Sequence, residues 1–289
     1  MRFGTLCSGI EGAAVAFEPF GWSLEFSSEI DPFCCALLEQ KYPGIPNYGD
    51  ITKTSVPCVD LIVSGTPCQS FSVNGKRQGM DDPRGQLAVR FTEILRQRRP
   101  SWVVWENVPG VLSANGGRDF GSFLGSLVKL GYGVSYRILD GRSFGVPQRR
   151  RRVFVVGCYR HEGRAAAVLA DAPARREDAG PSRKVRQGSF GVQPPTRETL
   201  YGWTGDETPK FDIECCPTLR AFQGGEGVGV IGEKIFRKLT IDEWEALQGF
   251  PRGYTDIDGA SDSARRRAIG NAFCVPVMRW IGQRIKELA

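Results

Sequence analysis

The sequence predicts an α/β protein with a mixed, mostly parallel sheet and a second, smaller lobe. Short apolar runs alternate with helix-like segments through about the first 160 residues, which is typical of strand–helix–strand units. The alternation stops there, and residues 160–236 are rich in Gly, Pro, Arg and polar residues without a clear period. A helical pattern returns at residue 241. We therefore expect an irregular, strand-rich small lobe in the middle of the chain.

Each element follows from local signals. Strands are predicted at residues 3–8, 22–28, 60–64, 102–105, 132–139 and 152–157. Helices are predicted at residues 12–20, 31–40, 85–98, 120–130, 241–248 and 272–288. Pro32 suits a first helical turn, and Pro100 and Gly131 end the two helices that precede them. The last helix should pack on an apolar surface through Val275, Met278, Ile281 and Ile285.

Composition limits the function classes. No apolar run approaches the ~20 residues of a membrane helix, and the N-terminus lacks the layout of a secretory signal, so we expect a cytoplasmic protein. The net charge is +6. Residues 142–186 hold twelve Arg and Lys against four Asp and Glu, an excess of eight, so the rest of the chain sums to about −2. Such concentrated charge favours an anionic partner, whereas a bare charge run is more often a solvated face.

One of the nine cysteines stands out. The chain has no C-x-x-C spacing and one histidine, so neither a metal site nor a disulfide framework is expected, and most cysteines should be buried and inert. Cys68 instead follows Pro67 after a predicted strand, in GTPCQSFS at 65–72. A thiolate among small residues at that place can act as a nucleophile. The single histidine argues against a Cys–His protease.

Other unusual stretches also follow predicted strands, where ligands bind in α/β sheets. They are TLCSGIEG at 5–12, SEID at 28–31, GDI at 49–51 and WENVP at 105–109. Each has a plain alternative in isolation: a Gly turn is commonly a connection, and Asp31 could simply cap a helix. Glu106, after a strand ending in Trp, could have a raised pKa and donate a proton. The run VPQRRRRV at 146–153 suits a polyanion.

In this order, the motifs resemble the DNA cytosine-5 methyltransferase family of phage and bacterial type. The resemblance extends to RKLTIDEWEALQGFP at 237–251 and GNAFCVPV at 270–277, and so spans nearly the whole chain. CPTLRAFQGG at 216–225 resembles an element of the family's target-recognition region. The resemblance implies a Rossmann-like, S-adenosylmethionine-dependent catalytic domain at 1–160, a small target-recognition domain at 161–262, and a C-terminal segment, 263–289, that returns to the large domain.

The resemblance also implies the reaction. Methyl passes from S-adenosylmethionine to carbon 5 of a cytosine flipped out of a specific sequence in double-stranded DNA, through a covalent adduct with Cys68. Glu106 hydrogen-bonds the ring and helps to protonate it, and Arg150 and Arg152 hold the base. The implied cofactor-binding residues are Thr5, Cys7, Ser8, Gly9, Ile10, Glu29, Ile30, Asp50, Ile51, Pro67, Asn271 and Ala272. The implied DNA-binding residues are Gln69, Ser70, Ser72, Arg84, Gln148, Thr218 and Arg220. We expect no metal, a monomer, and a possible partner nuclease as in restriction–modification systems.

Three residues depart from the family pattern. Thr5, Cys7 and Glu11 stand where the family often has an aspartate, an aromatic residue that stacks on adenine, and a glycine. Two other functions stay open. A transfer-RNA methyltransferase shares the scaffold, but its usual Cys-Phe-Thr signature is absent from this sequence. A catalytically idle DNA-binding relative is the other, and the intact catalytic set argues against it.

Overall fold

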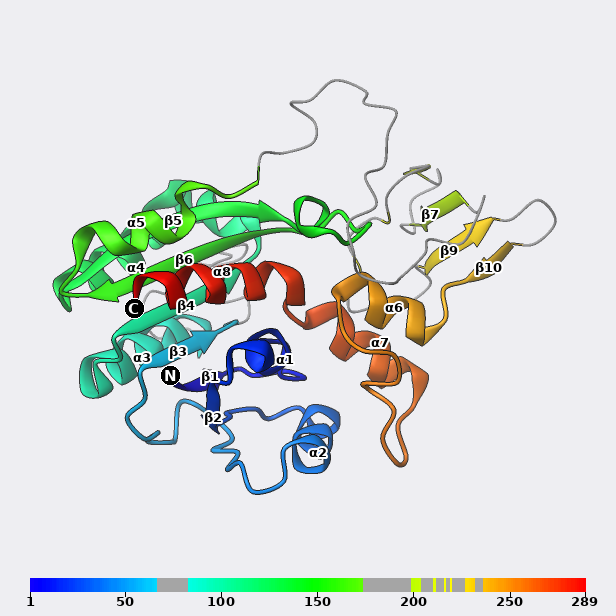
Figure 1. The fold of residues 1–289 in the computed structure, drawn as a ribbon, viewed down its shortest axis with the longest axis horizontal. Helices are drawn as coiled ribbons and strands as arrows, with labels where there is room; N and C mark the ends of the chain where they lie inside the picture. The colour runs from blue at the N-terminus through cyan, green and yellow to red at the C-terminus, as the bar shows by residue number, and fades with distance from the viewer. Residues whose placement is uncertain are drawn as a thin grey trace.

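The computed structural model describes residues 1–66, 83–173, 199–203, 210–211, 216, 219, 227–231 and 236–289. Its main body is a six-stranded sheet in the order β2-β1-β3-β4-β6-β5 (Figure 1). The strands are β1 (Arg2–Leu6), β2 (Ser23–Phe26), β3 (Leu61–Ser64), β4 (Trp102–Asn107), β5 (Tyr132–Asp140) and β6 (Arg151–Tyr159). The predicted α/β class with a mixed, mostly parallel sheet is confirmed.

Strand order creates the place for a site. β1 pairs in parallel with both β2 and β3, and β3 pairs in parallel with β4. The strand order therefore reverses at β1, because β2 lies on one side of it and β3 and β4 lie on the other. Ligands bind at such a switch point, beyond the carboxyl ends of the strands. β6 lies antiparallel between β4 and β5, so its first residues reach the same edge.

Both faces of the sheet are covered, and strand residues alternate between two cores. Leu61 and Val63 pack in the core that includes α1 (Gly12–Phe17), α5 (Glu162–Ala170) and α8 (Val275–Leu288). Ile62 packs in the second core, with α3 (Pro83–Arg98) and α4 (Arg118–Lys129). A strand buried on both faces must be apolar at every position, which explains the continuous run at 61–63.

The first helix is shorter than the predicted 12–20. α1 ends at Phe17, and a 3-10 turn follows at Glu18–Phe20. Pro19 has no N–H to donate to the carbonyl of Val15, so the α-helical pattern stops. Arg279 of α8 donates to the Val15 and Ala16 carbonyls instead, each at 3.3 Å, which fastens the last helix to the first.

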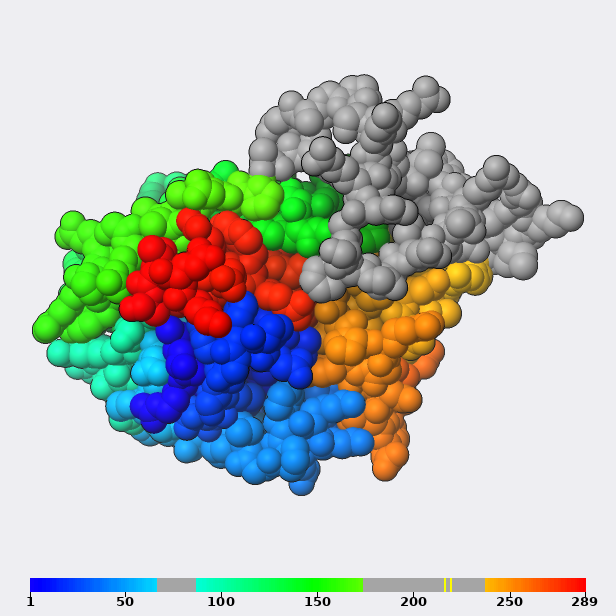
Figure 2. Space-filling model, in the orientation of Figure 1, coloured from blue at the N-terminus to red at the C-terminus, as the bar shows by residue number. Residues whose placement is uncertain are grey.

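The C-terminal helix lies on the large sheet. α8 packs against α1 and α5, and Arg284 donates to the Ala167 carbonyl of α5 at 3.0 Å. In Figure 2, α8 (red) lies against the N-terminal residues (blue) on this face. The helix begins at Val275 rather than at residue 272, because Pro276 takes a first-turn position while Ala272 is extended.

Two helices were not predicted, α5 and α7 (Asp262–Asn271). α5 lies in the stretch described above as lacking a period, and its sequence, EGRAAAVLA, carries only a weak polar–apolar alternation. Arg137 of β5 donates to the Leu169 and Ala170 carbonyls at the end of α5. α5 lies just beyond the boundary predicted at residue 160 and belongs to the layer that covers the large sheet.

The smaller sheet is antiparallel, in the order β10-β9-β7-β8. Its strands are β7 (Thr199–Trp203), β8 (Lys210–Phe211), β9 (Gly227–Ile231) and β10 (Phe236–Lys238). α6 (Ile241–Gln248) follows β10 and leads back toward the large sheet through α7 (Figure 1). α2 (Pro32–Lys41) flanks β2. None of the helices in the described parts is long and apolar enough to cross a membrane.

Candidate active site

An acid and an arginine face each other where β4 and β6 meet. The Nε atom of Arg152 lies 3.2 Å from Oε1 of Glu106, and their side chains are 14% and 11% exposed. Among the described residues Oε1 has no hydrogen-bond partner, so the contact with Arg152 is an ion pair without an aligned hydrogen bond. Burial raises the pKa of Glu106, while the charges of Arg152 and Arg150 act to lower it. The carboxyl is thus placed to hold a proton beside a cation.

β4 also holds the start of the cysteine motif. The indole Nε1 of Trp105 donates to Oγ1 of Thr66 at 2.8 Å, and Nδ2 of Asn107 donates to the Thr66 carbonyl at 3.2 Å. Thr66 immediately precedes Pro67 and Cys68 in the sequence. The two neighbours of Glu106 in β4, Trp105 and Asn107, therefore hold Thr66 in place, just before the predicted nucleophile in the sequence.

The loop after β1 joins the end of β2. Cys7 and Gly9 have left-handed backbone angles, with φ of 54° and 56°, and a Cβ atom on Gly9 would meet no atom within 4 Å. The Gly9 amide donates to Oε2 of Glu29 at 2.7 Å. Oε1 of Glu29 accepts from the amides of Ile30 and Asp31. This carboxylate is held in place at the sheet edge beside open space.

Other predicted cofactor residues surround this loop. Ile30 is 70% exposed, an unusual position for a large apolar side chain. Asp50 is half-buried at the edge of a turn, and hydrogen bonds from Thr52 lower the pKa of its carboxyl. Burial, followed by the charges of Glu29 and Asp50, raises the pKa of the Cys7 thiol to about 12, so this cysteine is unreactive. Thr5, Ile10 and Ile51 are buried, so only their backbone can face a ligand.

Arg150 links the arginine run at 149–152 to the segment between α7 and α8. It is 2% exposed and donates to the Gly270 carbonyl at 3.0 Å and to the Ala272 carbonyl at 2.7 Å. The guanidinium of Arg150, which the resemblance assigns to holding the base, is enclosed here and directed at backbone oxygens. Asn271, between the two accepting residues, is exposed.

Gln148, which is predicted to bind DNA, has a fully buried side chain. Within the described parts of the chain neither its oxygen nor its nitrogen has a hydrogen-bond partner. The backbone around it pairs with Cys216, through Arg149 N–H to the Cys216 carbonyl and Cys216 N–H to the Pro147 carbonyl, both at 2.8 Å. The backbone at Gln148 is thus paired with Cys216 while its side chain is buried.

Several predicted residues fall outside the described parts of the chain. These are Pro67, Cys68, Gln69, Ser70, Ser72, Thr218 and Arg220. Arg84 lies in α3, and its side chain is likewise not described. Their roles remain predictions from the resemblance.

The structure adds contacts that the sequence analysis missed. Arg90 of α3 donates to the carbonyls of Ile51 and Thr54, at 2.9 and 2.6 Å, and so fixes the turn that carries Asp50. The Tyr254 hydroxyl donates to the Ile10 carbonyl at 2.8 Å and lies 3.0 Å from the hydroxyl of Tyr42. No local pattern signals these bonds, which join residues far apart in the chain.

A six-stranded sheet with one antiparallel strand, an acid-lined loop at the β1 switch point and a Glu–Arg pair beyond β4 together define a Rossmann-like methyltransferase. The described residues contain no cluster of His, Cys, Asp and Glu that could hold a metal ion. Comparison with known protein families identifies the family of this chain. Residues 1–187 and 202–287 match the family described as "C-5 cytosine-specific DNA methylase". The chain belongs to this family, which confirms the resemblance, the enzyme class and the reaction at carbon 5 of cytosine in DNA.

Relatives agree. The chain is 30% identical to the Type II methyltransferase M2.BsuMI of Bacillus subtilis over 99% of this chain and 76% of that one. It is 32% identical to the Type II methyltransferase M.DsaV of Dactylococcopsis salina over 99% and 86%. The crystal structure of the S. pombe Dnmt2 methyltransferase superposes with a TM-score of 0.71 at 18% identity, covering 100% of this chain and 99% of that one. At that identity the likeness concerns the fold.

Proposed function

We propose that this protein methylates carbon 5 of a cytosine flipped out of a specific sequence in double-stranded DNA, with S-adenosylmethionine as donor and Cys68 as nucleophile. The observation that carries the proposal is the Glu106–Arg152 pair, which lies beside the Thr66 anchor leading into Cys68. An acid and a cation thereby lie at one edge of the sheet, next to the segment that leads in the sequence to the proposed nucleophile, and addition to a pyrimidine ring uses an acid, a cation and a thiol.

The edge at β1 and β2 fits a nucleoside cofactor. Glu29 offers carboxylate oxygens of the kind that accept from ribose hydroxyls, Asp50 offers a second acidic acceptor, and Ile30 gives an exposed apolar surface for a base. The open space beside Gly9 lets a ligand approach the backbone closely. We assign the cofactor to these residues.

Methyl transfer then depends on proton placement by this chain. The cofactor supplies an electrophilic methyl group. The Cys68 thiolate adds to carbon 6 of the ring while protonated Glu106 donates to the ring nitrogen, which neutralises the charge that addition creates. Arg152 holds the base from its carbonyl side. After carbon 5 takes the methyl group, a base removes the proton from carbon 5, the thiolate leaves carbon 6, and the ring nitrogen returns its proton to Glu106, which restores the aromatic ring.

The basic stretch around residues 142–186 supports binding to a duplex. The similarity to Type II methyltransferases supports a place in a restriction–modification system, with a partner nuclease. We propose that the protein acts as a monomer in the cytoplasm.

Two experiments test the function in order. Bisulfite sequencing of DNA from cells that express the protein should show methylated cytosine within one short sequence. A duplex with 5-fluorocytosine at that target should then trap the protein covalently, because fluorine cannot leave as a proton does. Cys68→Ser is the control, and it should neither methylate nor be trapped. A wild-type protein that methylates its target but is never trapped would contradict the adduct.

A further inference from the structure

We propose that Glu11 is a positioning residue for S-adenosylmethionine, which ties the ends of β1 and β2 together so that Gly9 and Glu29 stay side by side. The inference rests on the proposed cofactor. Glu11 stands where the family often has glycine, and its side chain accepts hydrogen bonds from Thr5 and Ser27.

The backbone at Glu11 gives the first reason. Its φ of 57° and ψ of 45° are left-handed, a conformation that glycine adopts freely and other residues adopt at a cost. The side chain is also fully buried, which is rare for a carboxyl group. The left-handed backbone and the burial of the carboxyl group both cost free energy, and the hydrogen bonds of the side chain offset that cost.

Those contacts join two strands through one oxygen. Oε1 of Glu11 accepts a hydrogen bond from Thr5 in β1, and a second at 2.6 Å from the hydroxyl of Ser27, just after β2. The Thr5 and Ser8 hydroxyls lie 2.7 Å apart, and Oγ of Ser8 accepts from the Ser28 amide at 3.0 Å. The carboxyl group is therefore the centre of a network whose outer members border Gly9 and Glu29.

The second carboxyl oxygen points to the protonation state. Within the part of the chain that the structure describes, the buried Oε2 has no hydrogen-bond partner, which disfavours a full negative charge. Burial raises the pKa of Glu11 to about 7, although the bonds from Ser27, Thr5 and Ser8 act to lower it, and the Glu29 charge raises it further. The groups that face it are Glu29 after β2, Tyr42 at the end of α2 and Tyr254 between α6 and α7. On the α8 side, Arg279 is bound to carbonyls of α1.

Two variants separate positioning from plain stability. Glu11→Gly suits the left-handed backbone but removes the tie, whereas Glu11→Gln keeps an oxygen for Thr5 and Ser27. Titration calorimetry with S-adenosylhomocysteine and S-adenosylmethionine should show a dissociation constant raised about five- to ten-fold in Glu11→Gly, since one or two hydrogen bonds are lost, and near the wild-type value in Glu11→Gln. Should Glu11→Gly not fold, Ser27→Ala, which removes one donor to the same oxygen, should raise the constant in the same direction.

A pH series gives an independent readout. The native state retains the Glu11 proton between about pH 4.5 and about pH 7, where the unfolded chain has lost it, so this group makes the protein less stable as pH rises through that window. The melting temperature of Glu11→Gln, measured without cofactor, should fall less over the same range. Equal slopes in the two proteins would overturn the proposed environment of Glu11.

Glu29→Ala serves as the reference for loss of the cofactor. If wild-type protein binds neither compound, the proposed function fails. If wild type binds, Glu29→Ala does not, and both Glu11→Gly and Ser27→Ala bind as tightly as wild type, the function stands and the role of Glu11 is wrong.

Discussion

Arg152 stands 3.2 Å from Glu106 across the junction of β6 and β4, and its charge opposes the effect of burial on that carboxyl. In the proposed reaction Glu106 acts in its protonated form, so the rate should fall as pH rises through the pKa of this group. Arg152→Gln removes the opposing charge, which raises the pKa of Glu106 further and moves the falling limb to higher pH. Single-turnover rates over roughly pH 6–10 measure this limb.

Arg152→Lys, which keeps a cation at the same place, is the control and should leave the falling limb near its wild-type position. Both variants are expected to be slower, because the base loses a contact, so the position of the limb decides the matter and the maximal rate does not. A limb that stays put in Arg152→Gln would mean that Glu106 does not set it.

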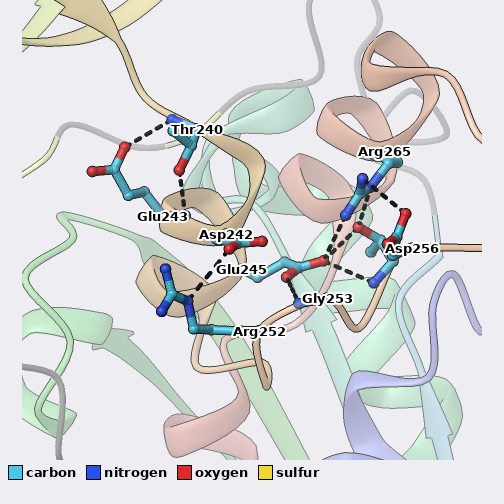
Figure 3. Close-up of polar contacts among 9 residues, drawn as sticks. Thr240, Asp242, Glu243, Glu245, Arg252, Gly253, Asp256 and Arg265 are labelled. Carbon is cyan, nitrogen blue, oxygen red and sulfur yellow. Dashed lines mark hydrogen bonds and ion pairs between the residues drawn. The ribbon is translucent and has the colours of Figure 1, made fainter.

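The second prediction concerns stability and uses two acids of α6 (Figure 3). Glu245 is fully buried, accepts from the amides of Gly253 and Thr255, and lies 3.6 Å from Arg265. Glu245→Ala should lower the free energy of unfolding by about 3 kcal/mol, because buried donors and a buried cation lose their partner.

Asp242 is the matched control on the same helix. It pairs with Arg252 at 3.4 Å, but the two side chains are 43% and 82% exposed (Figure 3). Asp242→Ala should change the free energy of unfolding by less than about 1 kcal/mol. Urea unfolding of both variants measures the contrast, and equal losses would contradict the buried role of Glu245.

A third prediction tests the anchor of the cysteine motif. Thr66→Val removes the oxygen that accepts from the Trp105 indole, and should cost about 1–2 kcal/mol of stability. Thr66→Ser keeps the hydroxyl and should lose less. Because Thr66 leads into Cys68, Thr66→Val should also slow trapping on 5-fluorocytosine DNA more than it weakens DNA binding. If Thr66→Val and Thr66→Ser are trapped at equal rates when saturated with DNA, the bond between Thr66 and Trp105 does not contribute to catalysis.

The fourth prediction concerns the flipped base. Extruding a cytosine breaks pairing and stacking, and costs less when the base opposite is mismatched. Cys68→Ser, with S-adenosylhomocysteine present, should therefore bind a mismatched target more tightly than a matched one, and a gain of ~1 kcal/mol would be about five-fold in the dissociation constant. Adding Glu106→Gln should shrink the gain. Identical affinities for the two duplexes would show that the bound state keeps the cytosine stacked.

Much of the fold could be predicted because the strands are buried on both sides. The run at 61–63 and the run at 102–105 are apolar at every position, and polar or small residues follow each of them. The edge on which the site lies could also be predicted, since parallel strands bring their carboxyl ends together. Glu29 and Glu106 both lie at that edge in the structure.

What could not be predicted depends on distant partners. Arg150 carries the same charge as Arg152 two residues away, yet one is enclosed among the carbonyls of residues 270 and 272 and the other faces Glu106. Nothing local separates them, because Arg150 directly precedes β6 and Arg152 lies near its start, and only the tertiary fold decides what each side chain meets. Glu11 is a similar case, since its tie to Ser27 appears only once β1 and β2 are paired.

The attachment of α8 to α1 bears on how the chain is made. A ribosome produces α8 hundreds of residues after α1, and until then Phe17 and its neighbours lack the surface that Met278 and Ile281 provide. The nascent protein must therefore carry an uncovered apolar face until α8 has been made. Loops that close over so long a separation form slowly, so protection by a chaperone during synthesis should matter more for this protein than its final stability suggests.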